Sequence, residues 1–111
     1  MAYDEALADR IREVLAAETG VTEMKMFGGL AFLVGGNMAV AASGEGGIMV
    51  RVDPESSEHL VATTSAQIVE MRGRQMRGWL RVPPDDVGTM RQLAQWVQLG
   101  ATFARSLPPK R

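Results

Sequence analysis

The sequence contains no cysteine and only one histidine, His59. The missing cysteine excludes disulfides, thiolate nucleophiles and cysteine-ligated zinc sites. His59 lies close to Glu55 and Glu58 in a short predicted helix, whereas catalytic zinc sites usually draw their ligands from more than one element. We therefore expect a surface histidine and no bound metal.

Long hydrophobic runs and a secretory leader are also missing. The first residues, MAYDEALADRIREV, are acidic and have the pattern of a helix, without the basic start and apolar core of a signal peptide. The longest apolar stretch is interrupted at 35–37, well short of the ~20 residues that a membrane-spanning helix needs. The sequence therefore predicts a soluble cytoplasmic protein with no membrane contact.

The motifs of common catalytic and nucleotide sites are missing as well. Glycine clusters at 28–29 and 44–47 precede strand-like segments, so neither can use a helix N-terminus to bind phosphate. The sequence has no G-x-S-x-G motif, and the adjacent Asp85 and Asp86 have the pattern of a turn into the last helix. We expect no catalytic residues and no cofactor, and hence a protein that is not an enzyme.

What is present is typical of one domain with its own core: 111 residues, of which 46% are hydrophobic and 23% charged. Asp53-Pro54 is typical of a helix start, and Thr89 with Gln92 has capping-box spacing. These patterns predict an α+β fold with an antiparallel sheet and the order α-β-β-β-α-β-β-α. The expected helices are 3–19, 54–62 and 89–106, the expected strands are 24–34, 38–43, 48–52 and two within 67–82 that turn at Gly73, and 107–111 form a tail.

Both faces of the first predicted strand are apolar. In KMFGGLAFLV, the odd positions Phe27, Ala31 and Leu33 are as apolar as the even ones, whereas a strand with one solvated face should alternate. We therefore expect something to cover the second face, and a partner subunit in a homodimer is the candidate. Glycines inside a strand indicate a bend or a close backbone approach. Phe27, Gly28 and Gly29 are thus an expected interaction surface.

A second expected interaction surface is the basic hairpin MRGRQMRGWLR, which contains no acid. Acids outnumber bases over residues 1–70, and bases outnumber acids over the rest of the chain. Strand alternation predicts that side chains at 77, 79 and 81 point to one side of this hairpin and those at 76, 80 and 82 to the other. The surface residues that we expect here are Arg72, Arg74, Arg77, Trp79 and Arg81.

Two interpretations of this hairpin stay open. An exposed Trp79 between two arginines can stack on a base while the arginines neutralise phosphates. Alternatively, Trp79 packs in a subunit interface and the arginines pair with acids such as those of the first helix. The eight methionines suit adaptable apolar packing, and a pI near 5.8 is unusual for a nucleic-acid-binding domain. We therefore favour an interface and keep a nucleic-acid or anion site as the alternative.

Three segments are similar to the TfoX/Sxy N-terminal domain family: KMFGGLAFLVGGNMAVAAS (25–43), GRQMRGWLRV (73–82) and LAQWVQLGATFARSLPPK (93–110). The resemblance covers nearly the whole chain, so it implies a single stand-alone domain of this type at 1–111. It also implies a two-layer α+β sandwich with an antiparallel sheet, akin to secretion-chaperone-like domains. Competence regulators contain such a domain, and the family has no established catalytic residues. The resemblance therefore implies a small, non-enzymatic regulatory module that binds an unidentified protein partner.

Overall fold

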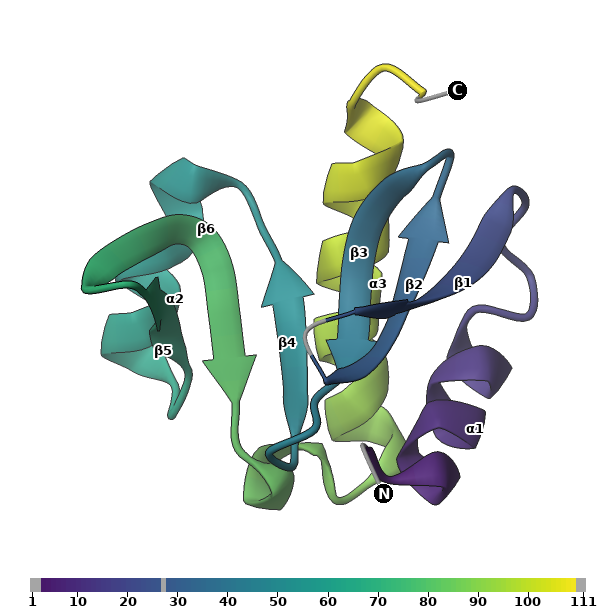
Figure 1. Cartoon of the computed structure of the whole chain (residues 1–111), viewed down its shortest axis with the longest axis horizontal. Helices are drawn as coiled ribbons and strands as arrows, with labels where there is room; N and C mark the ends of the chain where they lie inside the picture. Colours follow the sequence, from purple (N-terminus) through teal and green to yellow (C-terminus); the bar gives the residue numbers. More distant parts are fainter. Residues whose placement is uncertain (1–2, 27, 110–111) are drawn as a thin grey trace.

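The computed structural model describes residues 3–26 and 28–109 of the chain. In this part of the chain, α-helices pack on one face of a six-stranded antiparallel sheet with the order β1-β2-β3-β4-β6-β5, which confirms the predicted α+β class (Figure 1). The helices are α1 (Glu5–Val14), α2 (Ser57–Thr63) and α3 (Met90–Ser106), with short 3-10 turns η1 (Pro54–Ser56) and η2 (Pro84–Val87). The strands are β1 (Val21–Met26), β2 (Gly29–Val34), β3 (Asn37–Ala42), β4 (Ile48–Arg51), β5 (Gln67–Met71) and β6 (Arg74–Val82).

The prediction of a single strand at 24–34 is wrong. In the structure this segment contains the end of β1 and all of β2, which form a hairpin. Met26 and Gly29 face each other at the closed end of the hairpin, and Gly28 between them has a φ of 73°. This left-handed conformation is readily available to glycine, so the chain can reverse where an apolar run suggests continuity. The sheet therefore has one strand more than the predicted element order.

Gly29 is the place of a close backbone approach, one of the two alternatives that the sequence left open for the glycine pair. A Cβ atom at this position would lie 2.1 Å from the carbonyl oxygen of Ala42 on β3, so a larger residue does not fit between the two strands. The neighbour that approaches Gly29 thus belongs to the same chain. Phe27, which the sequence analysis placed in the same interaction surface, lies outside the described residues.

The helix starts follow the local signals in the sequence. Asp4 caps α1 by accepting hydrogen bonds from the backbone N–H groups of Ala6 and Leu7, and α1 ends at Val14, earlier than the predicted end at 19. Thr89 and Gln92 form the predicted capping box of α3. Among the described residues, no helix is long and apolar enough to cross a membrane.

Both faces of the sheet are apolar, as the first predicted strand indicated. The main core lies between the sheet and the helices and includes Phe32, Val50 and Leu93. A second cluster lies on the opposite face, where Met26, Leu33, Met71 and Trp79 pack against side chains that are buried within the chain itself. Figure 1 shows the end of β1 crossing in front of β2 and β3 on this face. The buried members of the second cluster are Ala31, Met38, Ala41, Met49 and Val69.

The second cluster changes the argument for a homodimer. Its five buried members are at most 6% exposed in the single chain, so this face needs no partner subunit to exclude water. The covering that the sequence assigned to a partner comes from the chain's own outer strands. The homodimer stays a prediction, and it no longer follows from the apolar character of the first strands.

The basic hairpin contains a bulge that reverses the predicted alternation of side chains. Ile68 pairs with Leu80, whereas the next residue, Val69, pairs with Met76. The extra residues in β6 surround Gly78, whose φ is 90°. Since paired residues share a face of the sheet, Met76 lies on the face of Val69 and not on that of Leu80, as the sequence had predicted.

Gly78 also fixes the hairpin to its neighbours. Its N–H group donates a hydrogen bond of 2.8 Å to the buried Oγ atom of Ser57, the first residue of α2. Its carbonyl oxygen accepts a hydrogen bond of 2.8 Å from the N–H group of Val52, just after β4. The bulge therefore connects β6 to α2 and to the end of β4, and it determines which way the hairpin side chains point.

Candidate functional site

Two of the hairpin arginines are paired with acids. The Nε atom of Arg77 lies 3.0 Å from Oε2 of Glu58 on α2, and this hydrogen bond holds the pKa of the Glu58 carboxyl below its usual value. The Nη1 atom of Arg81 lies 3.0 Å from Oε1 of Glu45, in the turn between β3 and β4. Pairing of the arginines with acids is thus observed for these two within one chain, and their partners lie outside the first helix. The subunit interface that the sequence analysis favoured stays a prediction. Arg77 consequently turns toward α2 and not, as predicted, to the side of Trp79.

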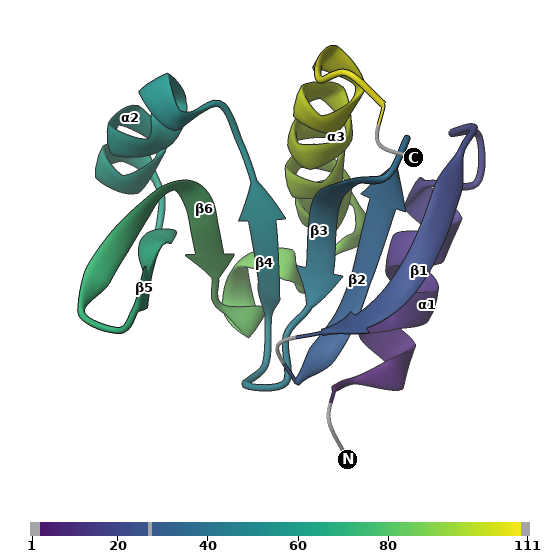
Figure 2. The ribbon, with the colours of Figure 1, turned by 45° about the horizontal axis from the view of Figure 1, so that its top comes forward.

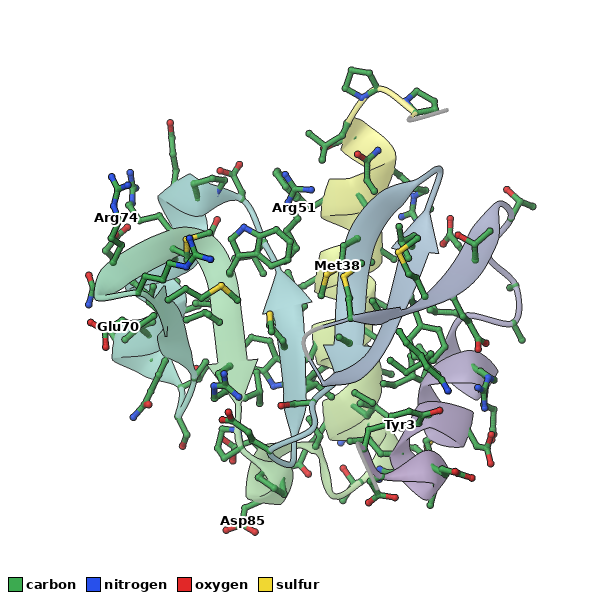
Figure 3. All side chains as sticks on the ribbon, in the orientation of Figure 1. Tyr3, Met38, Arg51, Glu70, Arg74 and Asp85 are labelled. Carbon is green, nitrogen blue, oxygen red and sulfur yellow. The ribbon has the colours of Figure 1, made fainter. Side chains whose placement is uncertain are left out.

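The other two arginines, Arg72 and Arg74, lie exposed at the tip of the hairpin. Together with Met71, Gln75, Met76, Arg77 and Trp79 they line a hollow of about 540 Å³, which we call the tip hollow. No acid is among these lining residues. In Figure 3, Arg74 lies at the outer end of β6 and extends away from the sheet. The tip hollow therefore has the positive charge that an anionic ligand would require.

Trp79 is less available than the sequence suggested. It is half-buried against the second cluster, and the guanidinium carbon of Arg51 lies 5.0 Å from its ring centroid. The same guanidinium lies 5.4 Å from the ring centroid of Phe103 on α3, so Arg51 sits between two aromatic rings. Cation–π contacts of this kind stabilise the junction of β4, β6 and α3. They also occupy part of the surface on which a base would have to stack.

The predicted interaction surface divides into two parts. Gly29 and Arg81 line a separate hollow of about 300 Å³ on the face of the second cluster, together with Met26, Met49 and Met71. Arg72, Arg74, Arg77 and Trp79 line the tip hollow instead. Gly28 lies exposed in the turn before β2 and lines neither hollow. The structure thus does not bring the two glycines and the tip arginines into one site.

A third surface, which the sequence analysis did not identify, lies between α2 and α3. Hollows of about 490 Å³ and 540 Å³ adjoin there and share Leu60 of α2 with Gln95 and Leu99 of α3. Figure 2 shows α2 and α3 standing apart on the same side of the sheet. We call this surface the interhelix groove. Its remaining apolar walls are Val52, Trp96 and Phe103, and Asp53 and Asp86 lie in the two different hollows.

The interhelix groove is lined mainly by apolar and uncharged polar side chains. Leu99 is 42% exposed, although it lies in the middle of α3, and Trp96 and Phe103 lie one turn away from it. Asp53 and Asp86 are the charged residues among those that line the two hollows. An exposed apolar side chain inside a concave, weakly charged surface is typical of a place where another protein binds.

The groove has little that would support catalysis. Its lining contains no histidine, and His59 lies exposed on α2. Within residues 3–26 and 28–109, no three side chains among histidines, aspartates and glutamates gather closely enough to hold a metal ion. What the groove offers to a ligand is apolar contact, hydrogen bonds to side-chain amides and hydroxyls, and one carboxylate in each hollow.

The sequence contained one signal that could have revealed the groove. Leu93, Val97 and Ala101 form the stripe of α3 that faces the core. Leu99 does not belong to this stripe, and it lies one turn from both Gln95 and Phe103 on the helix surface. An apolar side chain in that position, surrounded by glutamines rather than charges, indicates a second face of α3. Only the structure shows that α2 lies across from this face.

Comparison with known families identifies a family that matches most of the chain. The family model described as the TfoX N-terminal domain matches residues 13–104. A search of curated proteins finds no match to the chain. The matched residues extend from the end of α1 into the last turns of α3, so they include the basic hairpin and most of the interhelix groove.

Proposed function

The chain belongs to the TfoX N-terminal domain family, and on this basis we propose that it is a small, non-enzymatic regulatory module that binds another protein through the interhelix groove. The observation that carries the proposal is Leu99, an apolar side chain 42% exposed inside a concave surface between two helices. The resemblance to competence regulators supports a regulatory role.

The size and chemistry of the groove support a protein partner more than a small molecule. The two adjoining hollows extend along most of α3 and are open to solvent on one side. Small-molecule sites usually enclose most of the ligand and hold a few convergent polar groups. A groove between helices with a central apolar residue is instead typical of recognition of a partner's apolar side chains.

The experiment that tests the proposal is affinity capture from cell lysate, with and without nuclease. We expect a protein that remains bound after nuclease treatment, because the groove lining has no basic side chain that could hold nucleic acid. Loss of every captured protein on nuclease treatment would contradict the proposal. It would direct attention to the basic hairpin instead.

A second candidate function, binding of nucleic acid or another anion, is supported by the tip hollow. Arg72 and Arg74 contribute two exposed positive charges to a hollow without a lining acid. Binding that depends on phosphate contacts weakens steeply as salt concentration rises. The half-buried Trp79 offers only part of its ring to a base, so we rank this function below protein binding.

We expect that Arg72→Ala combined with Arg74→Ala abolishes any binding of a single-stranded oligonucleotide at low salt, measured by fluorescence anisotropy. Arg91→Ala is the control, because Arg91 is also exposed but lies at the start of α3, outside the tip hollow. If the wild-type chain does not bind at low salt, or if the double variant binds as well as the control, the second candidate function is excluded.

The homodimer is a separate proposal, which light scattering tests directly. We expect the mass measured in solution to rise from that of one chain toward that of two chains as protein concentration increases, since dimer formation follows mass action. A mass of one chain at every concentration would contradict it. The groove proposal would be unaffected by that result.

A further inference from the structure

We infer that the partner segment that binds in the interhelix groove is an amphipathic α-helix with a basic residue at each end. This inference rests on the proposed function and adds the chemistry of the partner. Three observations carry it: the backbone of the groove walls, the spacing of the apolar side chains, and the positions of the two acids.

The walls of the groove favour a helical partner over an extended one. An extended peptide that docks on a protein usually adds a strand to an exposed sheet edge, where its backbone groups find hydrogen bonds. α3 forms one wall of this groove, and Leu60 and Thr63 of α2 form the other together with the turns at 52–56 and 64–65. No residue that lines the two hollows belongs to a strand, so the groove offers no sheet edge. A partner in the groove must therefore satisfy its own backbone groups, and a helix does so.

The apolar side chains of α3 specify one stripe on that helix. Trp96, Leu99 and Phe103 follow a spacing of three and four residues along one side of α3, with Leu60 across from them on α2. A partner helix that lies along α3 complements this spacing with apolar residues at i, i+3 or i+4, and i+7. The surrounding glutamines can bond to polar side chains that flank the stripe.

The two acids lie toward opposite ends of the groove, so they favour the same charge at both ends of the bound helix, whichever way that helix runs. Asp53 lines the hollow near the C-terminal end of α3, and Asp86 lines the hollow near its N-terminal end. In Figure 3, Asp85, the neighbour of Asp86 in sequence, lies at the bottom of the molecule, well below Arg51, which is two residues from Asp53. Complementary charges favour lysine or arginine at both ends of the bound helix.

The length of the groove sets the distance between these basic residues. Lining residues on α3 extend from Gln92 to Ser106. At ~1.5 Å per residue this corresponds to roughly 21 Å, so the basic residues should lie at most about 14 positions apart on the partner. Two basic side chains lie near the Asp53 end, and neither lines the hollows. Arg51 is held between the rings of Trp79 and Phe103, and Arg77 pairs with Glu58 while it donates a hydrogen bond to the carbonyl oxygen of Pro54.

The test is selection from a displayed library of helix-forming peptides of about 18 residues, with the whole chain as bait. We expect the selected peptides to carry one apolar stripe with a basic residue near each end. They should lose affinity for the Leu99→Glu variant. The double variant Asp53→Lys, Asp86→Lys should bind them about tenfold more weakly, because two ion pairs become two repulsions. The same double variant, used as bait, should select acidic ends.

The outcomes separate the inference from the proposed function. Peptides that depend on Leu99 but have neutral or acidic ends overturn the inference and leave the groove as a protein-binding site. A wild-type chain that dimerises in solution while the Leu99→Glu variant stays a monomer identifies the groove as a contact between two copies and also overturns it. If no selected peptide depends on Leu99, both the inference and the proposed function fail.

Discussion

Replacing Gly100 by alanine should lower the free energy of unfolding by about 2 kcal/mol. A Cβ atom at this position would lie 2.3 Å from the carbonyl oxygen of Ala39 and 3.0 Å from Cγ2 of Val50, so α3 would have to move away from the sheet. Overpacking of this kind costs typically 1–3 kcal/mol, and the backbone contact places Gly100 at the upper end of that range. The better helix propensity of alanine returns about 1 kcal/mol. Urea denaturation measures the difference.

Gly88→Ala is the matched control for this substitution. Gly88 has a φ of −71°, and a Cβ atom there would have no neighbour closer than 3.9 Å. Its free energy of unfolding should stay within about 0.5 kcal/mol of the wild-type value or increase slightly. Equal denaturation midpoints for the two variants would show that α3 does not pack on β3 as closely as described. The position of one wall of the interhelix groove would then be wrong.

Replacing Leu99 by glutamate should weaken binding of the captured protein partner about 30-fold or more. Truncation or loss of a central interface residue commonly costs at least 2 kcal/mol, and here a charge is also forced into an apolar contact. The fold should be retained, because Leu99 is 42% exposed and the core stripe of α3 does not include it. Isothermal titration calorimetry measures the affinity, and circular dichroism checks the helix content.

Met24→Glu is the control for this effect. Met24 is 52% exposed, more than Leu99, but it lies on β1 at the far edge of the sheet from α2. The same change from an apolar to an acidic side chain should leave the affinity within about twofold of the wild-type value, because it lies outside the groove. If both variants lose affinity equally, the loss comes from the added negative charge or from a less stable fold, and not from the position of the residue. The groove would then have no special role.

The parts of the fold that local chemistry determines could be predicted from the sequence. Asp53-Pro54 begins η1, where the Asp53 side chain accepts a hydrogen bond of 2.9 Å from the N–H group of Glu55. Thr89 and Gln92 make the capping box. In each case the residues that form the signal are also the residues that make the bond. Helix starts and the α+β class were therefore accessible without a structure.

Features that depend on pairing between distant segments could not be predicted. The run from Met26 to Val34 contains no polar or charged side chain, so hydrophobicity alone does not show the reversal at Gly28. The bulge at Gly78 depends on how β6 pairs with β5, and one shift in register moves every following side chain to the other face. This is why Met76 and Arg77 were assigned to the wrong sides of the hairpin.

In the candidate site, too, local features could be predicted from the sequence and contacts between distant segments could not. The sequence identified the arginines of the hairpin, but their acids, Glu58 and Glu45, come from α2 and from the turn before β4. The interhelix groove requires Leu60 and Leu99 to face each other, although 39 positions in the sequence separate them. Composition and periodicity describe one element at a time. They contain no information about which helix faces lie opposite one another.

The most direct test of the central claim is amide hydrogen exchange, measured on the chain with and without its captured protein partner. The account predicts slower exchange on binding in two segments, α2 at 57–63 and the middle of α3 at 95–103, with little change in the hairpin at 70–79. Slower exchange confined to 70–79, with α2 and α3 unchanged, would place the partner on the basic hairpin. That result would contradict the interhelix groove as the binding surface.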